Sequence, residues 1–99
     1  MVRVIWTNHA INDLKGIAEY ISKDSQRYAN QLIERIYVKV GLLRNQPDSG
    51  RMVEELKKKN VRELLEGNYR IIYRKINATH IEILTIHHSA RRLKSPLIK

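Results

Sequence analysis

The sequence predicts an α+β fold in which an antiparallel hairpin of two helices covers one face of an antiparallel sheet. Three observations predict it: an alternating apolar segment opens the chain, two stretches with helical apolar spacing follow, and three alternating segments joined by short turns fill the second half. The order is β-α-α-β-β-β. Packing the helical hairpin on one sheet face is the simplest way to bury both apolar surfaces. At 99 residues, the chain is expected to form a single domain over 1–99.

The first strand and the first helix adjoin each other. Apolar side chains occupy alternate positions from Val2 to Trp6, which is typical of a strand. Thr7 or Asn8 then provides an N-cap for a helix over residues 8–23. The apolar stripe of this helix is Ala10, Leu14, Ile17, Ala18 and Ile21.

A second helix starts after Ser25, which is its predicted N-cap. Its stripe is Ala29, Leu32, Ile33, Ile36, Val40 and Leu43. Pro47 and the turn residues up to Gly50 end it. The short link near Asp24 predicts that the two helices run antiparallel.

The second half predicts an antiparallel meander after an irregular, charged segment over residues 50–60. The predicted strands cover residues 61–65, 69–76 and 80–87. They are joined by Glu66-Gly67-Asn68 and Asn77-Ala78-Thr79. Ser89 is a candidate cap for a short C-terminal helical turn over residues 90–93.

The composition is that of a basic globular protein. It is 42% hydrophobic and 29% charged, with a formal net charge of +9 at pH 7. The basic excess lies mainly in the second half, and residues 87–99 carry four Lys or Arg and no Asp or Glu. Such a field attracts nucleic acid, an acidic protein surface or an acidic regulatory peptide. The alternative is that the charge only keeps the protein soluble, and charge alone does not distinguish these possibilities.

Several classes of site and location are disfavoured. The chain has no Cys, which excludes disulfides and Cys-based zinc sites. No apolar run approaches the ~20 residues of a membrane span, and the first nine residues lack the apolar core of a signal peptide. We therefore expect a cytoplasmic protein with no membrane contact. Because no Gly-rich phosphate loop or metal-ligand spacing occurs, we also expect no cofactor and no metal.

Arginine recurs along the predicted strands. Arg70 and Arg74 point to the face opposite Tyr69, Ile71 and Tyr73. A guanidinium there can clamp a phosphate bidentately. The alternative is that the two arginines pair across strands with carboxylates, Arg70 with Glu63 and Arg74 with Glu82, or face water.

We take a set of arginines as candidates for binding a target or a phosphate. The set is Arg51, Arg62, Arg70, Arg74, Arg91 and Arg92. The hypothesis is that guanidinium groups from separate strands and the C-terminal tail converge on one solvent-facing patch, opposite the helices. The run Lys57-Lys58-Lys59 is either a solvated loop or a source of further phosphate contacts.

His87 and His88 end the last predicted strand. An unperturbed His titrates near pH ~6.5, so either could act as general acid or base. Adjacent residues on a strand point to opposite faces, so at most one is expected at any given site. The alternative is one buried, hydrogen-bonded His and one solvated His.

The ordered set of these residues resembles a known family. The matching pieces are Trp6, Ala10…Asp13-Leu14…Ile17…Tyr20-Ile21, Ala29…Ile33…Ile36…Leu43…Pro47…Gly50-Arg51, Val61-Arg62-Glu63-Leu64, Tyr69-Arg70-Ile71-Ile72-Tyr73 and Ile86-His87-His88…Arg91-Arg92. The set is similar to the RelE/ParE toxin superfamily of bacterial type II toxin–antitoxin modules, also called plasmid-stabilisation proteins. The resemblance covers nearly the whole chain and implies the same fold.

The resemblance implies one of two activities. RelE-like toxins cut mRNA in the ribosomal A site with a basic cluster, whereas ParE-like toxins poison DNA gyrase. Arg70 matches one RelE-type catalytic arginine. However, Glu63 would oppose the phosphate charge, and no Tyr follows Tyr73 to supply the late tyrosine. The Gly50-Arg51 turn also looks ParE-like, so the chain is placed nearer that branch.

Three functions are therefore carried forward. The first is a growth-inhibiting toxin that binds and poisons DNA gyrase. The second is a ribosome-dependent mRNA endoribonuclease with Arg70, His87, His88 and Arg91 as catalytic candidates, and the third is a plain nucleic-acid-binding module. The resemblance also implies a cognate antitoxin, expected to be acidic and to fold on binding. We expect some apolar positions of the helical hairpin to be exposed in the free chain.

Overall fold

The structure, a computed structural model, describes residues 1–89. Its elements are β1 (Arg3–Trp6), α1 (Asn8–Ser22), α2 (Gln26–Leu42), β2 (Arg51–Met52), β3 (Val61–Glu66), β4 (Tyr69–Lys75) and β5 (His80–His88). The predicted order β-α-α-β-β-β is confirmed, with the short β2 added in the segment predicted to be irregular. The helical turn predicted over residues 90–93, with Arg91 and Arg92, lies outside the described residues.

Local signals in the sequence fix where the helices and one turn begin. The Thr7 hydroxyl accepts a hydrogen bond from the Ala10 amide at 3.0 Å, and the Ser25 hydroxyl accepts one from the Tyr28 amide at 3.1 Å. These contacts satisfy amides that a helix start otherwise leaves without partners. In the β3–β4 turn Gly67 has φ +56°, a conformation that favours glycine.

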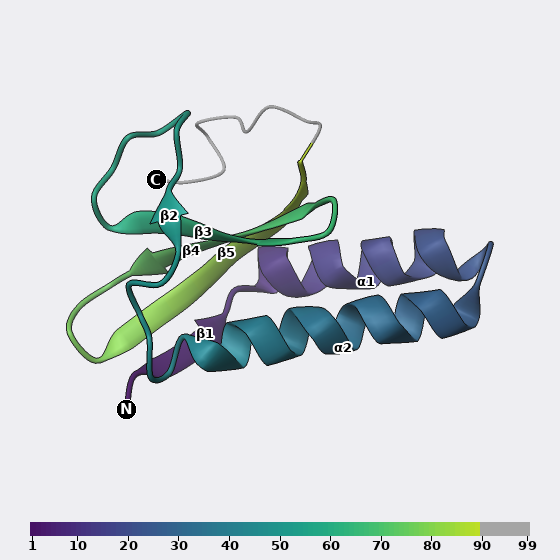
Figure 1. The fold of residues 1–99 in the computed structure, drawn as a ribbon, viewed down its shortest axis with the longest axis horizontal. Coiled ribbons are helices and arrows are strands. Elements are labelled where there is room, and N and C mark those ends of the chain that lie inside the picture. Colours follow the sequence, from purple (N-terminus) through teal and green to yellow (C-terminus); the bar gives the residue numbers. More distant parts are fainter. Residues whose placement is uncertain (90–99) are drawn as a thin grey trace.

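The sheet is mixed, so the prediction of a fully antiparallel sheet is wrong. Its strand order is β1-β5-β4-β3-β2, and β1 runs parallel to β5 while the other pairs are antiparallel. The helical hairpin carries the chain away from β1, and the meander returns β5 beside it (Figure 1). Alternation of apolar and polar residues shows which face of a strand is buried, but it does not show which strands lie beside it. The sequence therefore did not reveal that β1 pairs with β5.

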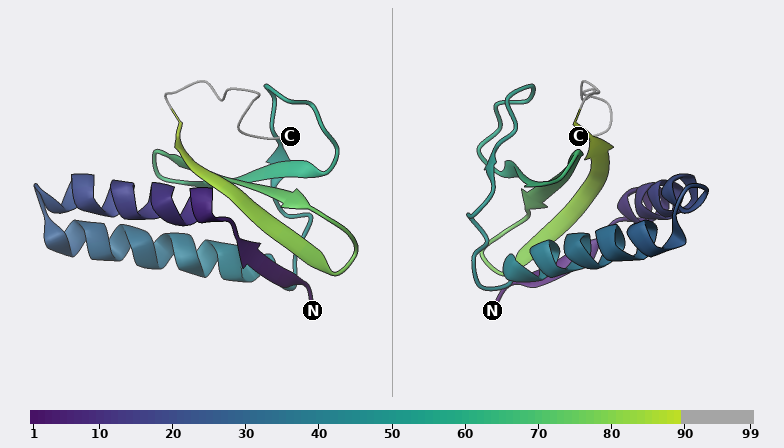
Figure 2. Two further views of the ribbon diagram at one scale, coloured as in Figure 1. Left: turned by 180° about the vertical axis from the view of Figure 1, so that it is seen from behind. Right: turned by 45° about the vertical axis from the view of Figure 1, so that its right-hand side comes forward.

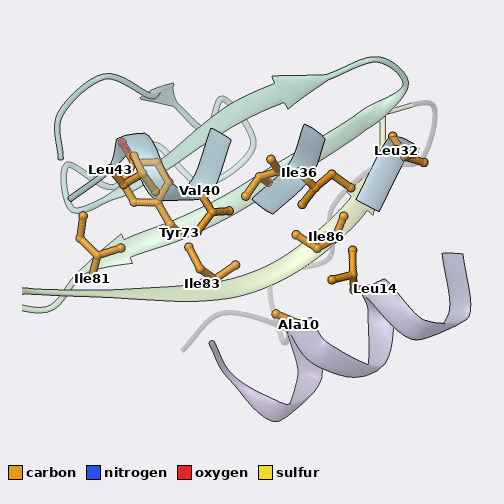
Figure 3. Close-up of a cluster of buried hydrophobic side chains, with 11 residues drawn as sticks. Ala10, Leu14, Leu32, Ile36, Val40, Leu43, Tyr73, Ile81, Ile83 and Ile86 are labelled. Carbon is orange, nitrogen blue, oxygen red and sulfur yellow. The ribbon is translucent and has the colours of Figure 1, made fainter. Parts of the chain in front are cut away.

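The two helices lie side by side on one face of the sheet (Figure 2). Between them and the strands lies the main core, where Ile36 of α2, its C-cap residue Leu43 and Tyr73 of β4 are fully buried (Figure 3). None of the helices in residues 1–89 has the length and apolar content that a bilayer span requires.

A smaller apolar cluster lies apart from the main core. It contains Val53, Val61, Ile72 and Leu84, with Leu56 packed against it. Ile72 neighbours Ile71 and Tyr73 of the main core along β4, so its side chain emerges on the opposite face of the sheet. The segment after β2 therefore packs on the sheet face that the helices leave open.

Asp13 attaches α1 to the edge of β5. The last residue of β5 paired with β1 is Ile83. Beyond it, the Asp13 carboxylate accepts hydrogen bonds from the Thr85 hydroxyl at 2.5 Å and from the Ile86 amide at 3.1 Å. These bonds satisfy polar groups that would otherwise be left at a partly buried strand edge.

Candidate functional site

Arg70 is buried on the sheet face away from the helices. It is the second residue of β4 and is 7% exposed. The Nε atom donates to Glu63 at 2.6 Å, while Nη1 and Nη2 each donate to a different oxygen of Glu55 at 2.7 Å. All three guanidinium nitrogens are therefore committed to carboxylates of the same chain.

The carboxylates around Arg70 form a connected ion-pair cluster. The hydrogen bonds that Arg70 donates to Glu55 are the largest influence raising the pKa of Arg70 above its usual range, and Glu63 adds to it. Glu63 is 4% exposed and also accepts a hydrogen bond from Arg51 at 2.9 Å. We call Arg51, Glu55, Glu63 and Arg70 the buried arginine cluster. Its carboxylates would repel a phosphate approaching Arg70.

Two further predicted arginines, Arg74 and Arg62, also lie within ion-pair distance of a carboxylate. Arg74 donates to Glu82 at 2.6 Å, and both side chains are partly exposed. The sequence alternative, in which Arg70 and Arg74 pair with Glu63 and Glu82, is thus what the structure contains. Arg62 lies opposite Tyr73 in the β3–β4 register, so it shares the helix-facing side of the sheet with that ring.

The hypothesis of one solvent-facing patch is therefore wrong for the arginines that the structure describes. Arg51, Arg70 and Arg74 lie on the face away from the helices, and Arg62 lies on the other face. Each is within ion-pair distance of a local carboxylate. The physical reason is that the fold brings carboxylates next to the arginines: Glu63 lies opposite Arg51 and Glu82 lies opposite Arg74 in the sheet. These local ion pairs stabilise arginines that would repel one another in a shared patch.

A clamp holds the loop after α2 against the sheet. The buried Tyr73 hydroxyl donates to the Pro47 carbonyl oxygen and accepts from the Gly50 amide, both at 2.9 Å. A Cβ on Gly50 would lie 2.7 Å from the Tyr73 ring and 2.8 Å from the Glu63 carbonyl oxygen, so glycine is required. Burial raises the pKa of Tyr73, partly opposed by the Gly50 hydrogen bond. The Gly50-Arg51 turn is thus a packing requirement.

The β4–β5 register separates the two histidines. His87 lies opposite Arg70, whereas His88 lies opposite Tyr69 and meets its ring edge-on, with centroids 5.4 Å apart. Cross-strand partners share a face, so His87 is the histidine on the side of Arg70. The described residues contain no group of three or more His, Cys, Asp or Glu that could hold a metal ion.

Apolar side chains are exposed on the helical hairpin, as the sequence led us to expect. The exposed fractions are 54% for Tyr37, 60% for Val38 and 53% for Leu42. These three residues, which we call the α2 patch, lie within two turns of α2. Tyr37 also contacts Trp6 of β1, with ring centroids 5.3 Å apart, so the patch continues toward the edge strand.

Sequence reasoning missed Glu55, which holds two of the three Arg70 nitrogens. Its signal was present, because apolar Val53 and Leu56 flank the acidic pair Glu54-Glu55 in a segment otherwise rich in charge. That pattern is typical of a segment with one side packed on the protein. Asp48 was also missed; a hydrogen bond from Lys75 is the largest cause lowering its pKa, and Arg62 contributes.

Comparison with known proteins identifies relatives over most of the chain. The sequence model of the family described as "ParE toxin of type II toxin-antitoxin system, parDE" matches residues 4–93. A solved structure titled "Chromosomal ParDE TA system from P. aeruginosa" is 27% identical and superposes with a TM-score of 0.72, covering 89% of this chain and 96% of that chain. A search of curated proteins found no match.

Proposed function

This chain belongs to the ParE toxin family of type II toxin–antitoxin systems, and from that premise we propose that it arrests growth by binding and poisoning DNA gyrase. We further propose that an antitoxin encoded beside it holds it inactive until needed. A gyrase target places its action in the cytoplasm. In this proposal the protein inhibits gyrase by binding it through a basic surface, and it needs no cofactor of its own.

The state of Arg70 is the observation that supports binding over RNA cleavage. A ribonuclease of the RelE type would need this guanidinium to meet the scissile phosphate. Here its three nitrogens donate to Glu55 and Glu63, and the side chain is 8% exposed. A phosphate would have to displace two carboxylates whose charge repels it. Arg70 is therefore assigned a structural role. Gyrase binding does not require Arg70 to break its ion pairs with Glu55 and Glu63.

Purified toxin and purified gyrase test the proposal directly. Relaxed plasmid, ATP and gyrase should yield less supercoiled DNA as toxin is added, and linear DNA should accumulate when the complex is denatured. Addition of the antitoxin before the toxin should restore supercoiling. Full supercoiling activity at a large molar excess of folded toxin would contradict the gyrase proposal.

A ribosome-dependent endoribonuclease is the second candidate, and one observation favours it. His87 lies opposite Arg70 on the same sheet face, which would put an acid–base group beside a guanidinium. If cleavage occurs, Glu55→Gln should increase it, because this change weakens the hold on Arg70. Translating ribosomes with mRNA provide the assay, read by primer extension. The gyrase proposal predicts no codon-phased cuts with either the wild type or the variant.

For the antitoxin we propose a docking site that includes the α2 patch. Tyr37, Val38 and Leu42 offer apolar area on a helix of a strongly basic protein, and an acidic amphipathic segment complements both properties. Such a segment orders as it binds. The exposed apolar area gives affinity, and the opposite charges speed association.

A double variant tests this docking site. Val38→Glu with Leu42→Glu should weaken antitoxin binding by at least tenfold, since two charges would have to be desolvated at an apolar contact. Gln26→Glu with Asn30→Glu is the matched control, because it adds the same charge to exposed positions of the same helix. Equal affinities for the two double variants, measured by calorimetry, would remove the α2 patch from the interface.

A further inference from the structure

A small basic hollow lies at the corner of the sheet farthest from the tip of the helical hairpin. It has a volume of about 290 Å³ and is lined by Asp48, Lys59, Asn60, Arg62, Lys75, Asn77 and Ala78. We call it the corner hollow. Three cations face a single carboxylate there. The loop after α2, the segment between β2 and β3, the start of β3, the end of β4 and the β4–β5 turn supply these residues, so segments distant in sequence build it.

Arg62 is incompletely satisfied in the corner hollow. Its Nη1 atom donates to the Gly50 carbonyl oxygen at 2.8 Å. Its Nε atom is buried and has no hydrogen-bond partner within the described part of the chain. The nearest carboxylate oxygen is Oδ1 of Asp48 at 3.9 Å, which is beyond hydrogen-bond range. A buried donor without a partner is unfavourable. The Arg62 Nε–H group would therefore be stabilised by an acceptor that approaches it more closely than Asp48 does.

The remaining polar groups of the hollow are suited to an anion. Lys75 pairs with Asp48 at 2.5 Å, and Asp48 shares that same oxygen with Arg62. The side-chain oxygen of Asn77 accepts a hydrogen bond from the Thr79 amide at 2.9 Å, which leaves the Asn77 NH₂ group to donate. Lys59 adds a third cation. The hollow therefore contains more hydrogen-bond donors than the Asp48 carboxylate can accept from.

We propose that the corner hollow binds a phosphate group of a nucleic-acid backbone, and that Asp48 occupies part of this site in the free protein. A phosphate oxygen can accept from several donors at once, and its charge matches the three cations. Lys57 and Lys58 precede the hollow in the chain and extend the positive field toward neighbouring phosphates. This site is separate from the buried arginine cluster. It goes beyond the gyrase proposal and does not depend on it, because the toxin alone binds the ligand.

Inorganic phosphate is the first probe. The Nε–H group of Arg62 gives its own signal in a nitrogen–proton NMR spectrum of the folded toxin. Titration with phosphate should shift this signal to saturation, and sodium chloride at equal ionic strength should not. An Arg62 signal that responds equally to both salts, or to neither, would overturn the phosphate site.

Duplex DNA is the second probe, and charge-matched variants isolate the site. Lys59→Gln with Lys75→Gln should weaken DNA binding about tenfold or more and reduce the salt slope by about two. Lys15→Gln with Lys23→Gln removes the same charge from exposed positions in α1 and at its C-cap, and should change binding little. The tip of the helical hairpin lies at the opposite end of the molecule from the β4–β5 turn (Figure 1). Equal losses for the two double variants would mean that net charge alone attracts DNA and would overturn the site.

Asp48 gives the sharpest comparison. Asp48→Asn should bind DNA more tightly than Asp24→Asn, although both remove one exposed negative charge. The reason is that only Asp48 competes with the phosphate for Lys75 and Arg62. If the two variants bind equally, Asp48 does not occupy the site. If an acidic polyglutamate peptide displaces DNA at equal charge concentration, the hollow recognises protein carboxylates and the proposal fails.

Discussion

Replacement of Arg70 by methionine should destabilise the protein more than any other single exchange of an arginine that the structure describes. The change leaves buried Glu63, with a side chain 3% exposed, and partly buried Glu55, at 16%, without their main partner. Removal of one member of a buried ion pair costs about 3–5 kcal/mol. That is a large part of the ~5–15 kcal/mol by which a domain of this size is stable. Arg51 remains near Glu63 but is mostly exposed and offsets little.

Urea unfolding, followed by circular dichroism, measures this cost. With a slope of roughly 1.5 kcal/mol per molar urea, the midpoint should fall by about 2–3 M. Arg74→Met is the matched control, because its ion pair with Glu82 has side chains 29% and 25% exposed and should contribute only about 1 kcal/mol.

A triple variant separates the loss of the ion pair from the loss of the buried charge. Arg70→Met with Glu55→Met and Glu63→Met should recover most of the stability, because no carboxylate is left buried without a partner. A cost for Arg70→Met alone that equals the cost for Arg74→Met would refute a structural role for the buried arginine cluster. It would leave Arg70 available for chemistry.

Two further predictions concern the clamp around Tyr73. Gly50→Ala should lower stability by several kcal/mol or prevent folding, because its Cβ would lie 2.7 Å from the Tyr73 ring and 2.8 Å from a backbone oxygen of Glu63. Gly16→Ala, in α1 with nothing within 4 Å of the added carbon, should instead gain about 0.5–1 kcal/mol in the same urea assay. Tyr73→Phe should cost about 1–3 kcal/mol at pH 7, because the Gly50 amide loses its acceptor and the Pro47 carbonyl its donor. Burial raises the pKa of Tyr73. The contribution of its neutral hydroxyl to the free energy of unfolding is therefore intact below pH ~10, and it declines as the pH rises above that value. The stability gap between wild type and Tyr73→Phe should therefore narrow above pH 10, and a gap that widens there would contradict the assignment.

Local patterns in the sequence predicted most of the elements. The caps at Thr7 and Ser25 and the turn at Gly67 are encoded within a few residues, so propensity and periodicity were enough to place them. The parallel pairing of β1 with β5 joins residues some 77 positions apart, such as Arg3 with His80, and no local pattern reports it. The two-residue β2 is too short to alternate.

The candidate site was predicted less well for the same reason. Alternation placed Arg70 and Arg74 on one face correctly, yet it could not show that Glu55 would reach Arg70 from a segment without regular structure. Arg62 was grouped with them by residue type, although its register puts it on the other face. Charge counts describe a field, whereas ion pairs depend on which side chains the fold brings within a few ångströms.

We propose that this toxin acts by binding gyrase while Arg70 stays in the buried arginine cluster. Induction of the chain in a growing bacterium distinguishes this mode of action from mRNA cleavage. DNA synthesis, SOS signalling and protein synthesis are recorded in parallel over the first minutes. If gyrase is the target, DNA synthesis should fall and SOS signalling should rise while amino-acid incorporation is still unchanged. An immediate fall in amino-acid incorporation, with mRNA cut in phase with codons and SOS signalling silent, would contradict it.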